Sequence, residues 1–201
     1  MQFAPGSRRF VLVPLALSIP AALFAPPFAA ALLAAGLFSM WFFRDPTRTP
    51  PPSGVVSPAD GRVSVIREEE GRVRVGVYMN AVDVHVNRAP FSGTVEAVEH
   101  RLGAHRPAFT KESERNERVD LTVRDDDGET HEVSLIAGWF ARRIHPYVSE
   151  GDAVARGDRI GHIDFGSRAD VLLPPDYDRG DVRVRVGERV TAGESVVAER
   201  E

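Results

Sequence analysis

Residues 10–43 contain no Asp, Glu, Lys, Arg or His, and this uncharged run constrains the 201-residue chain more than any other feature. The run is longer than the roughly 20 apolar residues that one straight membrane crossing needs. Pro26 and Pro27 stand in its middle, where a pair of prolines breaks a helix. The sequence therefore predicts two short apolar helices, near residues 10–25 and 28–43, that form a transmembrane hairpin.

Basic residues flank this run on both sides, with Arg8 and Arg9 before it and Arg44 after it. Because positively charged flanks stay in the cytoplasm, we expect both ends of the hairpin on the cytoplasmic face of the cell membrane. A secretory signal peptide cut near Ala29–Ala31 is the alternative. It is disfavoured because the second apolar half of the run would remain as a hydrophobic N-terminus.

The expected organisation has three parts. A membrane anchor occupies residues 1–45, and a stiff linker rich in proline occupies residues 46–54. A single folded domain then occupies residues 55–201, which is an ordinary length for one domain.

The charge of the part after Phe43 excludes several classes of function. It contains 23 basic and 29 acidic residues, a net charge of −6, so we expect no nucleic-acid partner. The absence of cysteine excludes thiolate catalysis and cysteine-bound zinc. The pair His131-Glu132 lacks the second histidine of a zinc-protease motif, and we expect no metal site.

Alternating apolar residues predict a domain made mostly of β-strands. Glu70-Gly71 and Asp127-Gly128 stand between such alternating segments and are typical of hairpin turns. We expect residues 106–118 to form a helical or irregular insert. The alternating sets are Val63/Val65, Val73/Val75/Val77, Val119/Leu121/Val123, Val133/Leu135 and Val182/Val184/Val186.

Two short patterns occur twice. Residues 151–160 and 187–196 share the order Gly-acid-x-Val-x-x-Gly-acid-x-aliphatic, and residues 58–63 and 90–95 share Pro-x-x-Gly-x-Val. Repeated short strands with glycine turns predict a small β-sandwich or half-barrel with internal pseudo-symmetry. This pattern resembles the barrel-sandwich fold of biotinyl and lipoyl carriers. The single lysine, Lys111, lies outside the repeats, so we do not expect a carrier function.

Four short motifs point together to one chemistry. They are Ser57-Pro58-Ala59-Asp60-Gly61, Asp83-Val84-His85, Asn116-Glu117-Arg118 and Phe165-Gly166-Ser167. With the apolar hairpin and Phe43-Arg44-Asp45-Pro46, their order and spacing resemble the phosphatidylserine decarboxylases, in the short membrane-anchored form of bacteria and archaea.

The resemblance implies that the chain cuts itself between Gly166 and Ser167 and converts Ser167 to a covalent pyruvoyl group. That group is the cofactor for decarboxylation of phosphatidylserine, or a close phosphoserine lipid, to phosphatidylethanolamine and CO₂. The mature enzyme would be a heterodimer of its own chains 1–166 and 167–201, acting on a phospholipid in the membrane.

The resemblance also implies the residues that do the work. Asp60 and His85 would activate Ser167, because a serine hydroxyl needs a base to become a nucleophile. Many relatives carry a second histidine three residues after the first, where this chain has Arg88. His85 would then serve both self-cleavage and decarboxylation, or another group must act in one step. Arg142 and Arg143 are weak candidates for the lipid phosphate.

A second hypothesis assigns no catalytic activity to the chain. In it the chain is a membrane-tethered barrel-sandwich adaptor, and Gly166-Ser167 is an ordinary turn. The two hypotheses differ in whether the chain is cut.

Overall fold

A computed structural model describes residues 2–104, 115–138, 143–163 and 167–200. The chain divides into two compact units, Met1–Thr47 and Arg48–Glu201.

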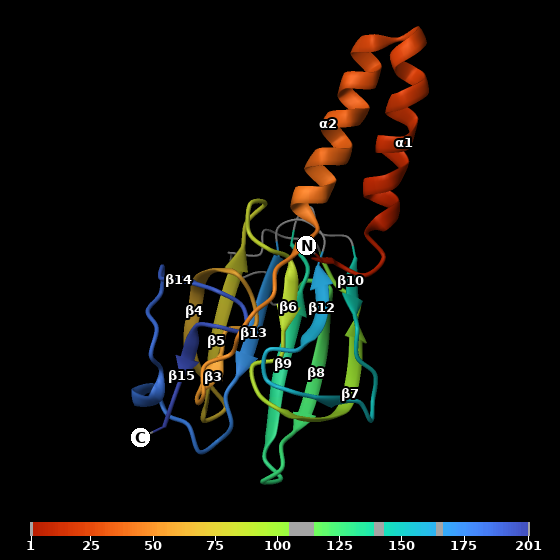
Figure 1. Cartoon of the computed structure of the whole chain (residues 1–201). Helices are drawn as coiled ribbons and strands as arrows, with labels where there is room; N and C mark the ends of the chain where they lie inside the picture. Colours follow the sequence, from red (N-terminus) through yellow and green to blue (C-terminus); the bar gives the residue numbers. More distant parts are fainter. Residues whose placement is uncertain (1, 105–114, 139–142, 164–166, 201) are drawn as a thin grey trace. The chain divides into compact units, whose positions relative to one another are not determined.

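The first unit is a pair of apolar helices closed by a short two-stranded ladder. The helices meet at Ala25, and Pro26 and Pro27 begin the second one, where proline needs no hydrogen-bonded N–H. Gly36 allows close packing, because a Cβ there would lie 2.5 Å from Leu15 Cδ2. The elements are β1 (Gln2–Phe3), α1 (Arg8–Phe24), α2 (Pro26–Phe42) and β2 (Arg44–Asp45) (Figure 1).

The two helices lie where the sequence predicts them, but the expectation of a transmembrane hairpin is not supported. Among the described residues, no helix is both long and apolar enough to cross a membrane. Each helix has 17 residues, which at 1.5 Å per residue spans about 25 Å, less than the roughly 30 Å of a bilayer core.

The second unit is mostly β, as predicted, and its centre is a curved eight-stranded antiparallel sheet that forms a half-barrel (Figure 1). In sheet order the strands are β11 (Ala153–Val154), β7 (Gly93–Arg101), β8 (Arg118–Arg124), β9 (Thr130–Ile136), β13 (Ser167–Leu172), β5 (Arg72–Met79), β4 (Gly61–Glu69) and β14 (Arg189–Val190).

Two smaller ladders complete this unit. The first contains β10 (Ile144–Pro146), β12 (Arg159–Ile163) and β6 (Val86–Arg88), in that order. The second pairs β3 (Val55–Val56) with β15 (Val196–Ala198), and a short 3₁₀ turn covers Arg179–Asp181. Apolar side chains of the large sheet, of β10 and β12, and of β3 and β15 form one buried core.

The predicted internal repeat is present in the structure. Val154 of β11 pairs with Gly93, and Val190 of β14 pairs with Gly61, so equivalent repeat positions occupy the two edges of the large sheet. Gly61 and Gly93 have φ angles of 149° and 156°, and a Cβ on either would lie within 2.5 Å of a carbonyl oxygen on the neighbouring strand. The shared Pro-x-x-Gly-x-Val pattern therefore places glycine where a residue with a side chain does not fit.

Both predicted hairpin turns are confirmed. Glu70 and Gly71 have φ angles of 52° and 78° between β4 and β5, and Gly128 has a φ of 86° between β8 and β9. The prediction of a strand from Val182, Val184 and Val186 is wrong. Val182 forms only an isolated bridge to Ala198. The 106–118 insert and Lys111 fall mainly or wholly outside the described residues.

Truncation of Leu135 tests the core. Leu135 is fully buried on β9 and lies opposite Val119 and Ala169 in the ladders. We expect Leu135→Ala to lower the free energy of unfolding by about 2–5 kcal/mol, because the substitution leaves a cavity. Denaturant unfolding followed by circular dichroism measures this loss. Leu102→Ala removes the same atoms from an exposed position and should change stability by no more than about 0.5 kcal/mol.

Candidate active site

Ser167 is the first residue of β13 and is completely buried. It lies opposite Met79 of β5, and its Oγ donates a weak hydrogen bond to Met79 Sδ at 3.9 Å. Asn87 Nδ2 donates to the same sulfur at 3.6 Å, so Asn87 of β6 and Ser167 both contact the Met79 side chain. Gly166 lies outside the described residues.

His85 is buried immediately before β6 and has a defined tautomer. Its Nδ1 lies 3.0 Å from the main-chain oxygen of Asp83. A carbonyl oxygen only accepts, so Nδ1 carries the proton and Nε2 has the lone pair that a base needs.

His85 and Ser167 lie at the same end of the domain. The main-chain N–H of Ile163 donates to the oxygen of His85 at 3.4 Å. Ile163 is four residues from Ser167, and four residues span at most about 14 Å. The fold thus places these two residues, 82 positions apart in the sequence, in the same part of the domain.

Asp60 has a different environment from the one that the motif resemblance implied. Its carboxylate accepts two hydrogen bonds from Arg48 Nη2, at 2.8 and 3.0 Å, and one from the Ala192 N–H at 2.8 Å. Burial raises the pKa of Asp60, although both partners lower it. In this structure Asp60 is therefore hydrogen-bonded to Arg48 and Ala192 rather than to His85.

Asp83 is a buried acid of the Asp83-Val84-His85 motif, and the family resemblance assigned no role to it. Its Oδ2 accepts from the Asn80 N–H at 3.0 Å, and its Oδ1 accepts from Arg189 Nη2 at 2.7 Å. These contacts fix the loop whose main-chain oxygen orients His85. The Asp-x-His spacing was the sequence signal that could have revealed this role of residue 83. It places a main-chain oxygen two residues before the imidazole that it orients.

Sequence reasoning also missed a group of polar rings contributed by β10, by the residue that follows it and by β12. His162 Nδ1 lies 2.7 Å from the Tyr147 hydroxyl, and the His162 ring stacks on His145 with 4.4 Å between centroids. Burial, assisted by the nearby His145 and His85, lowers the pKa of His162 to about 4. His162 is therefore neutral at pH 7. No sequence motif links these residues, because their contact depends on the pairing of β10 with β12.

Arg142 and Arg143 were the weak candidates for binding the lipid phosphate, and the structure describes only the second. Arg143 is exposed just before β10. Arg142 lies outside the described residues.

The lowered pKa of His162 predicts a pH dependence of stability. The pKa in the folded state, about 4, is below the ordinary value of 6.5, so protons favour the unfolded chain below pH 6.5. His162→Gln should remove a loss of up to about 3 kcal/mol that the parent suffers as the pH falls from 6.5 to 4. Urea unfolding across this range measures the slope for both proteins. Equal slopes would contradict a neutral, buried His162.

Comparison with known proteins agrees with the motifs. The sequence profile of the family described as phosphatidylserine decarboxylase matches residues 35–198. A Halobacterium salinarum protein named as an archaetidylserine decarboxylase proenzyme is 55% identical over 195 residues, covering 96% of this chain and 97% of that protein. A Streptomyces avermitilis phosphatidylserine decarboxylase proenzyme is 52% identical over 165 residues, covering 82% of this chain and 74% of that protein. This chain belongs to the phosphatidylserine decarboxylase family.

Proposed function

We propose that this chain is a proenzyme that cuts itself between Gly166 and Ser167 and then decarboxylates phosphatidylserine or its archaeal counterpart. The observation that carries the proposal is the position of Ser167. It lies fully buried at the start of a strand, at the same end of the domain as a buried histidine of defined tautomer. The family membership and the proenzyme names of the relatives point to the same reaction.

Self-cleavage uses groups that the chain itself supplies. Ser167 Oγ attacks the carbonyl carbon of Gly166 while His85 Nε2 accepts the hydroxyl proton, and the peptide C–N bond is replaced by an ester. Loss of the Cα proton and breakage of the Cβ–O bond release chain 1–166 with a terminal carboxylate. Addition of water and loss of ammonia then leave a pyruvoyl group at position 167.

The surroundings of residue 167 fit such a group. A pyruvoyl group supplies an electrophilic carbonyl that takes up the electrons left on Cα when CO₂ departs. Met79 and Ala169 are fully buried near this position, so the chain excludes water there. His85 would hold the proton that returns to the Cα of the product.

Strand pairing explains how the two products of cleavage stay together. β13 is hydrogen-bonded to β5 on one side and to β9 on the other. β14 pairs with β4, and β15 pairs with β3. Each strand of residues 167–201 therefore has a partner in residues 1–166, and the mature heterodimer needs no covalent link.

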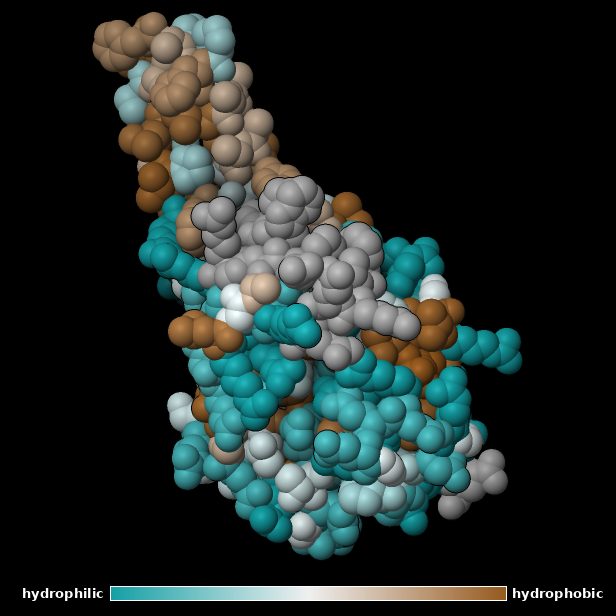
Figure 2. All heavy atoms as spheres, turned by 180° about the vertical axis from the view of Figure 1, so that it is seen from behind, coloured by the Kyte–Doolittle hydropathy of each residue, from teal (hydrophilic) through white to brown (hydrophobic). Residues whose placement is uncertain are grey.

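We propose further that the helical hairpin holds the domain at the cytoplasmic face of the cell membrane. Large apolar side chains are exposed along both helices, including Leu23 and Phe24 at 80% and 87%. Figure 2 shows apolar surface covering much of this hairpin. Helices shorter than the bilayer core can still bury this surface by entering one leaflet, where a diacyl substrate is concentrated.

Replacement of Ser167 tests self-cleavage. The parent should give two chains by intact mass, dividing after Gly166, with the small chain lighter than a serine start by one ammonia. Ser167→Ala should give one uncut chain without decarboxylase activity. His85→Ala should slow cleavage by about 10²-fold or more, the usual contribution of a general base.

A matched control exists in the same chain. Gly6-Ser7 has the same two residues, and Ser7→Ala should leave cleavage unchanged. A parent chain that stays full-length after long incubation would favour the non-catalytic adaptor instead.

Charges placed at the hairpin tip test the membrane proposal. Leu23→Glu with Phe24→Glu should reduce flotation of the protein with phospholipid vesicles, because carboxylates resist burial in lipid. Leu102→Glu changes an exposed leucine of the β domain and should float as the parent does. Equal flotation of the double variant and the parent would contradict an anchor role for the tip.

A further inference from the structure

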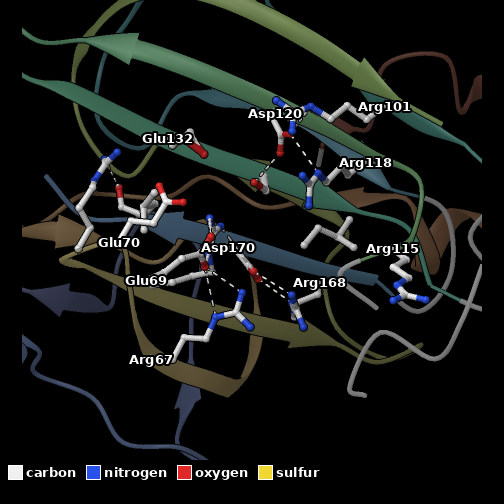
Figure 3. A pocket seen from close by; sticks show the side chains of 15 residues that line it. Arg67, Glu69, Glu70, Arg101, Arg115, Arg118, Asp120, Glu132, Arg168 and Asp170 are labelled. Atoms are coloured by element: carbon white, nitrogen blue, oxygen red, sulfur yellow. Dashed lines mark hydrogen bonds and ion pairs between the residues drawn. The ribbon is translucent and has the colours of Figure 1, made fainter. Parts of the chain in front are cut away.

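The large sheet carries a charged groove on the face opposite its apolar core. The groove has a volume of about 520 Å³ and is lined by seven arginines and five carboxylates, mainly from β4, β5, β7, β8, β9 and β13 (Figure 3). This excess of positive charge is local, since the sequence after Phe43 has a net charge of −6.

Three of these arginines form one row across neighbouring strands. Arg101 of β7 lies opposite Arg118 of β8, and both Arg118 and Arg168 lie opposite Ile136 of β9. Figure 3 shows Arg101, Arg118 and Arg168 at the same end of the groove. Like charges aligned across strands repel one another, so this row is costly unless something compensates it.

Part of the compensation comes from a neighbouring row of acids, each two residues away from its arginine on the same strand. The pairs are Arg101–Glu99 at 2.8 Å, Arg118–Asp120 at 3.1 Å and Arg168–Asp170 at 2.7 Å. Ser134 Oγ also donates to Asp120 at 2.6 Å. These contacts hold the guanidinium groups in fixed positions, as a preformed anion site requires.

A fourth arginine at this end of the groove, Arg115, directly precedes the Asn116-Glu117-Arg118 motif. Asn116 is buried and its Nδ2 donates to the Ala137 oxygen at 2.8 Å, which ties the start of β8 to the end of β9. Arg115, immediately before this anchor, lines the groove and is exposed. Arg101 is also exposed, so two of the four cations are open to a ligand from solvent.

The row ends one residue from the proposed reaction centre. Arg168 follows Ser167, and consecutive Cα atoms are about 3.8 Å apart. In a phosphoserine headgroup only three bonds separate the reacting Cα from phosphorus. Successive side chains of a strand point to opposite faces, so a phosphate held by this row would lie near the start of β13, on the face opposite the Ser167 side chain.

We propose that Arg101, Arg115, Arg118 and Arg168 form a phosphate-binding site that takes the phosphodiester of a phospholipid headgroup. Guanidinium groups bind phosphate through paired, charge-assisted hydrogen bonds. As a site for the substrate's own phosphate, the inference rests on the proposed decarboxylase function. The same chemistry would also accept free phosphate, and the test separates these two sources.

The test measures binding without catalysis. The full-length Ser167→Ala chain in non-ionic detergent is titrated with short-chain phosphatidylserine, and separately with inorganic phosphate, by calorimetry. We expect Arg115→Gln with Arg118→Gln to weaken phosphatidylserine binding by about tenfold or more, the usual loss when hydrogen bonds to a charged group are removed. Asp120 keeps Arg101 and Ser134 as partners in this variant, so the sheet should stay folded.

Arg124→Gln is the matched control. Arg124 lies on β8 six residues after Arg118, on the same face, and Arg124→Gln removes one of the two positive charges that the double variant removes. It should bind phosphatidylserine as the Ser167→Ala parent does. In the cleaved enzyme, Arg115→Gln with Arg118→Gln should raise KM for phosphatidylserine more than it lowers kcat.

The outcomes separate the possibilities. Selective loss of phosphatidylserine binding supports a lipid headgroup site, and equal loss of inorganic phosphate binding assigns the site to free phosphate. Binding of both probes unchanged in the double variant would overturn the proposal. A parent chain that never cleaves but binds phosphate through these arginines would reject the decarboxylase function and leave the site in place.

Discussion

The pairing of β13 on both sides is the constraint on which the rest of this molecule depends. Six of its residues are in register with β5 and five with β9, so its backbone is hydrogen-bonded along both edges. If the chain is cut before Ser167, this ladder holds the new terminus in place. A shift of one residue would exchange the two faces of the strand and move Arg168 and Asp170 into the apolar core. The register is therefore strongly specified by pairing on both edges and by the contrast between the two faces of the strand.

The same strand serves two environments. Ser167, Ala169 and Val171 face the core, whereas Arg168 and Asp170 face the charged groove. Gly76 of β5 makes room for this arrangement, because a Cβ there would lie 2.6 Å from Asp170 Oδ1. One short strand thus carries both the proposed reaction centre and one arginine of the proposed phosphate site.

Much of the fold could be predicted because it rests on local patterns. Alternating valines located the strands, and Pro26 with Pro27 located the break between the helices. Val182–Val186 alternates just as well yet forms no strand, because no neighbouring strand pairs along its length. Periodicity reports which side chains suit a strand, and partners far away in the sequence decide whether it forms.

The site was harder to predict for the same reason. Ser167 and His85 belong to short motifs, but the Tyr147–His162 contact and the arginine row exist only through pairing between distant strands. The groove left no distinctive signal, since the Arg-x-Asp pattern of Arg118 and Arg168 also occurs at Arg124, Arg156 and Arg179. Each copy alone is typical of a solvent-exposed face. Only the shared position opposite Ile136 turns two ordinary ion pairs into one row.

Arg88 bears on how the proposed chemistry is divided. It occupies the position where the family resemblance implies a second histidine in many relatives. Its Nη1 donates to the Gly157 oxygen at 3.0 Å, in one of the glycine turns of the internal repeat. A guanidinium stays protonated at neutral pH and cannot act as a base. We therefore infer that Arg88 supports the turn between β11 and β12, and that of these two positions only His85 exchanges protons.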